Sequence, residues 1–146
     1  LFEEEKFQQI APIQYYKEPE KLVYRFISNR LTFAYDDTKT LTLNSANILI
    51  PKSTFNIKYI LALLNSAPLQ FYFENTFSSF KVLRHHIEAF PIPIIDFSKE
   101  KEIEGLVNLI LQEDKEEILN NLYQELDEEV CKLFCLSKKE IICLIK

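Results

Sequence analysis

Two groups of cationic and amide side chains are the residues of this chain best suited to bind a ligand. Arginine can form a pair of hydrogen bonds with the two major-groove acceptors of guanine, and asparagine can do the same for adenine. The first group could contact such base edges and comprises Arg25, Asn29, Arg30, Lys39, Asn44, Asn47 and Lys52. The second group suits phosphate oxygens and comprises Ser79, Lys81, Arg84 and His85.

Each of these residues also has an ordinary structural explanation. Lys and Arg are mostly solvated surface residues, and Asn often forms turns. Arg25 lies within a strand-like run and could instead form an ion pair with an acid such as Asp37. The case for contact is strongest for four cations, which we expect to share one electropositive concave face: Arg30, Lys52, Lys81 and Arg84.

Short runs of β-branched and aromatic residues must position the first group. Apolar and polar residues alternate there with a period of two, which predicts strands at Leu22–Ile27, Leu31–Tyr35, Leu41–Leu43 and Asn47–Ile50. The sequence Asp36-Asp37-Thr38-Lys39 predicts a turn, because short Asx side chains bond to their own backbone. We therefore expect a small, twisted, mostly antiparallel sheet.

Helical spacing of apolar residues follows these strands. Asn56 can cap a helix that begins at Ile57, and Pro68 suits the first turn of a second helical stretch that continues from Leu69 to Phe77. In that stretch Tyr72 and Phe73 could stack on a base, but their spacing favours the core. The range 82–95 is predicted to be extended, because residues before proline avoid the helical region.

The sequence after Asp96 predicts amphipathic helices. Ser98 is a candidate cap for the first, the range 116–134 has an apolar stripe for the second, and Ser137 and Glu140 have the spacing of a capping box for a short third. The predicted fold class is α+β, a small mostly antiparallel sheet with packed helices followed by a C-terminal helical hairpin. We divide the chain into a linker or tail of a preceding domain (1–20), a recognition domain (21–95) and a helical subdomain (96–146).

The net charge of −5 is unevenly distributed along the chain. Residues 21–95 contain eight Lys and Arg against four Asp and Glu, or +4, whereas residues 96–146 contain seven against thirteen, or −6. The first twenty residues carry two against five, or −3. This asymmetry permits nucleic-acid binding by the middle segment but is not the basic excess of an independent binder. We therefore expect it to need a larger partner domain.

The composition argues against catalysis and against a metal site. Gly105 is the only glycine, whereas a phosphate-binding loop, a Rossmann turn or a nucleophile elbow needs two or more. Two short stretches, 4–6 and 37–39, match only fragments of a metal-dependent nuclease motif. The three cysteines lack the paired short spacing of a structural zinc site. We expect free thiols in a reducing cytoplasm and core packing for two of these residues, Cys131 and Cys135.

Two further absences bear on the context of the chain. No apolar run approaches the roughly 18 residues that a membrane span needs, so we expect no membrane partner. The chain begins at Leu1 and contains no Met, so we expect it to be a segment of a longer polypeptide.

Four pieces of sequence, in this order, resemble the TaqI-like C-terminal specificity domain, the target-recognition part of bacterial restriction–modification proteins. They are VYRFISNRLTFAYDD (23–37), LTLNSANILIP (41–51), ILALLNSAPLQFYF (60–73) and FPIP (90–93). The chain departs from the family at Phe134-Cys135-Leu136, where Tyr-Gly-Leu is common. It departs again after Ser78-Ser79-Phe80, where relatives are often glycine-rich.

The resemblance implies a module that reads double-stranded DNA for a bacterial, cytoplasmic enzyme. Its other partners would be N-terminal methyltransferase or nuclease domains of the same chain. Those domains would methylate adenine with S-adenosylmethionine and could also cleave DNA with magnesium, so no catalytic residue and no cofactor is expected in this chain. The alternative is a helical protein-interaction scaffold without DNA binding, which the acidic second half and its apolar stripes support.

Overall fold

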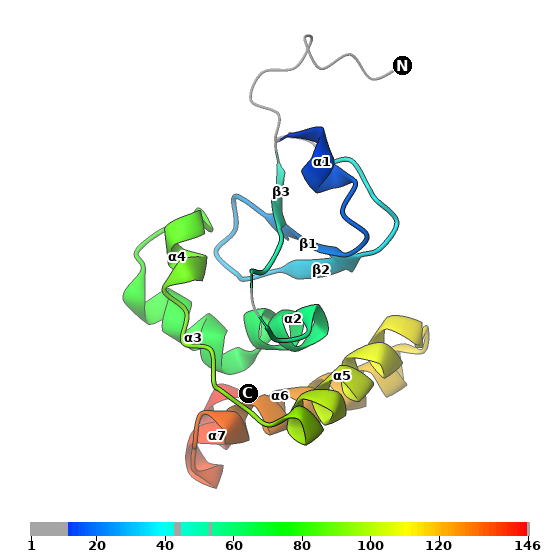
Figure 1. The fold of residues 1–146 in the computed structure, drawn as a ribbon. Coiled ribbons are helices and arrows are strands. Elements are labelled where there is room, and N and C mark those ends of the chain that lie inside the picture. Colours follow the sequence, from blue (N-terminus) through cyan, green and yellow to red (C-terminus); the bar gives the residue numbers. More distant parts are fainter. Residues whose placement is uncertain (1–11, 43–44, 53, 146) are drawn as a thin grey trace.

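A sheet, a pair of central helices and a C-terminal group of helices form three successive layers (Figure 1). The computed structural model describes residues 12–42, 45–52 and 54–145. The sheet has three antiparallel strands, and helices follow it to the end of the described chain. The predicted α+β class, with its small antiparallel sheet and C-terminal helical region, is confirmed.

The sheet has the strand order β2-β1-β3, with β1 at Lys21–Arg25, β2 at Phe33–Asp36 and β3 at Ala46–Leu49. Both outer strands are antiparallel to β1 and therefore run parallel to each other. The connection 37–45 must consequently cross from one end of the sheet to the other. The strand predicted at Leu41–Leu43 is wrong for Leu41 and Thr42, which belong to this crossover, and Leu43 lies outside the described residues.

One face of the sheet packs on α2, Ile57–Asn65. Leu22, Tyr24 and Phe33 are buried on this face, and the rings of Tyr24 and Phe33 stack with centroids 5.0 Å apart. Helix α2 also contacts α5 on its other side, which explains why six consecutive residues, 59–64, are buried. The predicted cap is confirmed, because Asn56 Oδ1 accepts a hydrogen bond from the Lys58 amide at 2.8 Å.

Helix α3, Ala67–Thr76, begins with Pro68 in its first turn, as its sequence predicted. Phe73 is buried and Tyr72 is half-buried against the same core, so their core assignment is confirmed. The extended conformation predicted for 82–95 is wrong over α4, Arg84–Glu88. The pre-proline restriction acts only on the residue directly before each proline, and α4 ends before Phe90.

The C-terminal layer contains α5 (Phe97–Gln112), α6 (Glu116–Leu133) and α7 (Lys138–Leu144). The cap predicted at Ser98 is wrong, because the Asp96 carboxylate accepts the Lys99 amide at 2.9 Å and starts α5 earlier. The predicted capping box is confirmed, since the Ser137 amide donates to Glu140 Oε2 at 2.7 Å. Residues of α5 and α6 join the core of the sheet and α2, so one hydrophobic cluster spans the predicted boundary at 95–96.

The two cysteines expected in the core have different environments. Cys131 is buried in α6, but Cys135 is exposed, so the prediction for Cys135 is wrong. Helix α6 ends at Leu133, and Cys135 follows with a φ of 56°, the left-handed conformation in which glycine commonly ends helices. This is the position at which the resembling family commonly has glycine.

Short helix α1, Ile13–Tyr16, precedes β1 and covers the start of the sheet (Figure 1). Within the ranges that the structure describes, no helix combines the length and hydrophobicity required to cross a membrane. In the same ranges, no three His, Cys, Asp or Glu side chains are grouped so that they could hold a metal ion.

Candidate nucleic-acid interface

The sheet separates the candidate residues into two groups, one at each end of β1. The Lys21 end is where β1 starts, β2 finishes at Asp36 and β3 finishes at Leu49. The Arg25 end is where β1 finishes and β3 begins. Lys39 and Lys52 follow β2 and β3 and are exposed beyond the Lys21 end, whereas the other described candidates lie toward the Arg25 end. The expectation that Lys52 shares one face with Arg30, Lys81 and Arg84 is therefore wrong, because β3 carries it to the opposite end of the sheet.

A buried ion pair closes the Lys21 end. Lys21 Nζ contacts the Asp36 carboxylate and also donates to the Tyr16 carbonyl at 3.2 Å. The amides of Thr38 and Thr40 each donate to Asp36 at 3.0 Å. Burial acts to raise the pKa of Asp36, but the hydrogen bonds from Lys21 and both threonines outweigh it and hold the pKa well below 3.8. The predicted turn is thereby formed, with Lys39 between the two threonines at a φ of 59°.

Two serine turns build the Arg25 end, at residues 28–30 and 79–81. Ser28 Oγ donates to the Arg30 carbonyl at 2.6 Å and accepts the Arg30 amide at 3.1 Å. Ser79 Oγ makes the same two bonds with Lys81, at 2.9 and 3.0 Å. Each hydroxyl therefore ties a three-residue turn that has one residue at its tip and a cation after it.

The paired serine turns lie against each other, although some 50 residues separate them in the sequence. The Ser28 amide donates to the Phe80 carbonyl at 2.9 Å, and Ile27 forms an antiparallel bridge with Lys81. A further bond runs from the Val82 amide to the Phe26 carbonyl, also at 2.9 Å. This pairing brings together five of the predicted residues: Arg25, Asn29, Arg30, Ser79 and Lys81.

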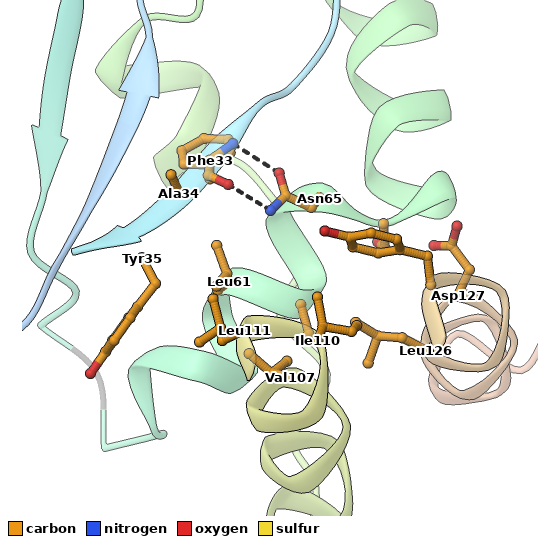
Figure 2. A pocket seen from close by; sticks show the side chains of 13 residues that line it. Phe33, Ala34, Tyr35, Leu61, Asn65, Val107, Ile110, Leu111, Leu126 and Asp127 are labelled. Atoms are coloured by element: carbon orange, nitrogen blue, oxygen red, sulfur yellow. Dashed lines mark hydrogen bonds between the residues drawn. The ribbon is translucent and has the colours of Figure 1, made fainter. Parts of the chain in front are cut away.

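Side-chain amides of α2 and α3 form hydrogen bonds with the first serine turn and with the strand that follows it. Gln70 Oε1 accepts the Leu31 amide at 2.7 Å, and Gln70 Nε2 donates to the Asn29 carbonyl at 3.4 Å. Asn65 bonds both the amide and the carbonyl of Phe33 at 2.8 Å (Figure 2). The first turn is therefore held by the helices of the core, and the second turn is held through its pairing with the first.

The cations of the Arg25 end are exposed and poorly neutralised. In the described part of the chain, no carboxylate lies at ion-pair distance from Arg25, Arg30 or Lys81. Lys81 Nζ lies over the Phe26 ring, 5.7 Å from its centroid, which is a cation–π contact. Arg84 is also exposed, but its Nε donates to Glu88 at 2.7 Å on the same helix.

Some predicted residues have structural partners that limit their part in recognition. The Ser79 hydroxyl is used within its turn, and Asn47 lies opposite Tyr24 on the α2 face with its amide 3.5 Å from the Tyr24 hydroxyl. The ion pair considered between Arg25 and Asp37 is not formed, and Asp36 pairs with Lys21 instead. Asn44 lies outside the described residues.

A buried histidine that the sequence did not single out fixes the segment after the second turn. His85 is exposed as a candidate phosphate ligand, whereas His86 is buried and stacks on Phe77 with ring centroids 4.3 Å apart. His86 Nδ1 accepts the Leu83 amide at 3.2 Å. Burial, and then the neighbouring His85, lower the pKa of His86 and keep it neutral. Adjacent histidines give no sequence signal for which one is buried.

Ile27 and Phe80 are two more exposed residues that sequence reasoning missed at the Arg25 end. Both are apolar and fit ordinary core patterns, so only their exposure distinguishes them. Phe80 lies between the predicted residues Ser79 and Lys81, and Ile27 lies two residues from both Arg25 and Asn29. This adjacency is the one sequence signal that could have identified them.

A separate apolar groove lies between β2, α2, α5 and α6 (Figure 2). Its volume is about 260 Å³, and its walls include Tyr35, Leu61, Ile110 and Leu126. The one carboxylate in the wall, Asp127, accepts the Ala67 amide at 2.9 Å, and burial raises its pKa. The groove therefore suits an apolar group better than an anionic one.

A comparison with protein families gives one match. The model of the TaqI-like C-terminal specificity domain matches residues 1–92, which include the sheet, α2, α3, α4 and both serine turns. No curated protein matches the chain.

Proposed function

The chain belongs to the TaqI-like C-terminal specificity domain family, and from this premise we propose that it binds duplex DNA through the paired serine turns and reads base edges there. It is thus a recognition domain of the restriction–modification type. In our proposal Arg30 and Asn29 contact bases, while Lys81 and Arg84 contact phosphates. Arg25 and His85 flank them, and Lys39 and Lys52 give weaker, distant contacts.

The single observation that carries this proposal is the convergence of cations and an amide on one exposed, rigidly anchored end. The Arg25 end gathers three cations that have no carboxylate at ion-pair distance among the described residues, although Arg30 interacts electrostatically with Asp127 from farther away. The exposed amide of Asn29 belongs to the same end. The mutual repulsion of the cations brings no stability to the fold, but it favours a polyanionic ligand. The two adjoining chain segments are paired in antiparallel fashion like a two-stranded ribbon, a structure that the major groove of B-DNA admits.

We further propose the context in which this domain works. Separate domains of the same polypeptide would methylate adenine with S-adenosylmethionine and could cleave DNA with magnesium, in the bacterial cytoplasm. The chain itself would hold the duplex while another domain acts on the target base. The acidic residues 96–146 would face away from DNA, because their net charge of −6 opposes the phosphates.

A salt titration of duplex binding tests the proposal. The 146-residue chain should bind a fluorescent duplex weakly, with an apparent constant that falls steeply from about 50 to about 200 mM salt. Three to four phosphate contacts would give a log–log slope of about −3. No binding at the lowest salt, or binding that does not depend on salt, would contradict the proposal.

A protein-interaction scaffold is the second candidate function, and one observation favours it. Large apolar side chains remain exposed on α5 and α6, among them Leu109, Leu111, Ile118 and Tyr123. Surfaces of this kind often bind protein partners. Sizing chromatography at several concentrations separates the two functions: a stable dimer that neither binds nor responds to duplex DNA would support the scaffold.

A further inference from the structure

The Arg25 end exposes two large apolar side chains among its cations. Phe80 is 78% exposed and Ile27 is 68% exposed, although both belong to a well-ordered, hydrogen-bonded pairing. Leaving such area in water brings no stability to the free chain. A ligand that covers these residues would recover that free energy.

The second serine turn gives Phe80 its position. The Ser79 hydroxyl bonds both backbone groups of Lys81, so Phe80 is the central residue of a closed three-residue turn. Asn29 holds the same place in the first turn, between Ser28 and Arg30. The two turns therefore have equivalent tips, one carrying an amide and the other an aromatic ring.

Ile27 belongs to the same surface because it is bridged to Lys81, the residue after Phe80. Arg25, Arg30 and Lys81 belong to the same paired segments, and no described carboxylate lies at ion-pair distance from them, although Arg30 interacts electrostatically with Asp127. The positive charge around the apolar pair therefore favours a polyanionic ligand over an uncharged, apolar surface of another protein. Within the major groove of DNA, the apolar feature available for contact is the C5-methyl group of thymine.

We infer that Phe80 and Ile27 are specificity residues that contact the C5-methyl group of a thymine in the recognised sequence. This inference rests on the proposed function and deepens it. The amide tip at Asn29 would read a hydrogen-bonding base edge, while the apolar tip at Phe80 would read the methyl group beside it. The two turns would then read neighbouring base pairs by different chemistry.

Replacing thymine by uracil tests the inference, because it removes the methyl group and keeps the base pair. The 146-residue chain first selects its preferred sequence from duplexes with a randomised core. That duplex is then remade with uracil at one thymine position at a time. We expect one or two positions at which uracil weakens binding about fourfold, the change given by about 0.8 kcal/mol for one buried methyl group.

Variants assign this effect to the apolar pair. Phe80→Ala should bind the thymine and uracil duplexes equally, and Ile27→Ala should reduce the difference. Phe97→Ala and Ile94→Ala are the matched controls, since these side chains are 73% and 91% exposed at the start of α5 and just before it. Both controls should keep the thymine preference of the unmodified chain.

The outcomes separate this inference from the proposed function. Two outcomes would overturn the inference alone. In the first, the chain selects a defined sequence but binds it equally well when any of its thymines is replaced by uracil. In the second, Phe80→Ala keeps the preference for thymine over uracil. Failure to select any sequence would overturn the proposed function and the inference with it. Urea unfolding of Phe80→Ala checks its fold, which we expect to be unaffected because the side chain is exposed.

Discussion

At the Lys21 end of the sheet a cation and a carboxylate are buried together, whereas at the Arg25 end three cations are exposed with no carboxylate at ion-pair distance among the described residues. The two ends belong to the same five-residue strand, β1. Asp36 collects bonds from Lys21, Thr38 and Thr40, and these bonds fix the crossover that follows β2.

Whether a charged side chain is buried or exposed helps to distinguish a structural role from a role in ligand binding. A buried charge is tolerated only when it is paired and hydrogen-bonded, so its partners show that it serves the fold. Exposed like charges held on anchored turns add no stability, so their arrangement indicates an external ligand.

The largest effect is expected at the Lys21 end. Asp36→Ala removes one partner of the buried pair and leaves Lys21 uncompensated, which should lower the free energy of unfolding by about 3–5 kcal/mol. Urea denaturation measures the loss. The control is Asp37→Ala, an exposed neighbour whose removal should change stability by no more than about 0.5 kcal/mol. Equal losses of unfolding free energy in the two variants would show that the ion pair does not stabilise the Lys21 end.

Acid should weaken the same interaction. The folded pKa of Asp36 is depressed below 3.8, so its contribution to stability is complete above that pH and is lost as the pH falls toward the folded pKa. The unmodified chain should therefore lose stability more steeply below about pH 4 than Asp36→Asn does. Parallel pH profiles for the two proteins would contradict this assignment.

Binding to DNA should be more sensitive to charge at the Arg25 end. The double variant Arg30→Ala/Lys81→Ala should weaken duplex binding at least tenfold, or about 1.4 kcal/mol. It should lower the salt slope by about 0.9, because only Lys81 of the two is assigned to a phosphate. Lys39→Ala/Lys52→Ala removes the same net charge beyond the Lys21 end and should have a clearly smaller effect. Equal losses would mean that net charge, and not the paired serine turns, determines binding.

The smallest effect concerns His86 beneath the second turn. Its folded pKa is lowered below 6.5, so the unfolded chain binds more protons and stability should fall as the pH drops from about 7 to about 5. The groups that face His86 are His85, Phe73, Phe77 and the backbone at Lys81 and Leu83. His86→Phe should reduce this pH dependence, whereas His85→Ala should retain most of it. If His85→Ala loses the pH dependence of stability and His86→Phe retains it, the assignment of this dependence to His86 is wrong.

Local sequence signals predicted much of the fold. The caps at Asn56 and Ser137, the proline in the first turn of α3 and the apolar stripes of α2, α5 and α6 all follow from residues within a few positions of each other. Hydrogen bonds and packing at i, i+3 and i+4 determine these features, so they can be derived from spacing alone. The α4 helix and the Asp96 cap escaped the same reasoning, because more than one local conformation fitted their sequences.

For the candidate site, the residue types could be derived from the sequence: cations and amides are concentrated before residue 96 and acids after it. Which of these residues lie close together depends on the fold. Strand order placed Lys39 and Lys52 beyond the Lys21 end, and the pairing of residues 26–28 with 80–82 brought the two serine turns together and left Phe80 exposed. Contacts between segments some 50 residues apart depend on how α2 and α3 bring the chain back to the sheet. Residue spacing within a short segment does not predict such long-range contacts.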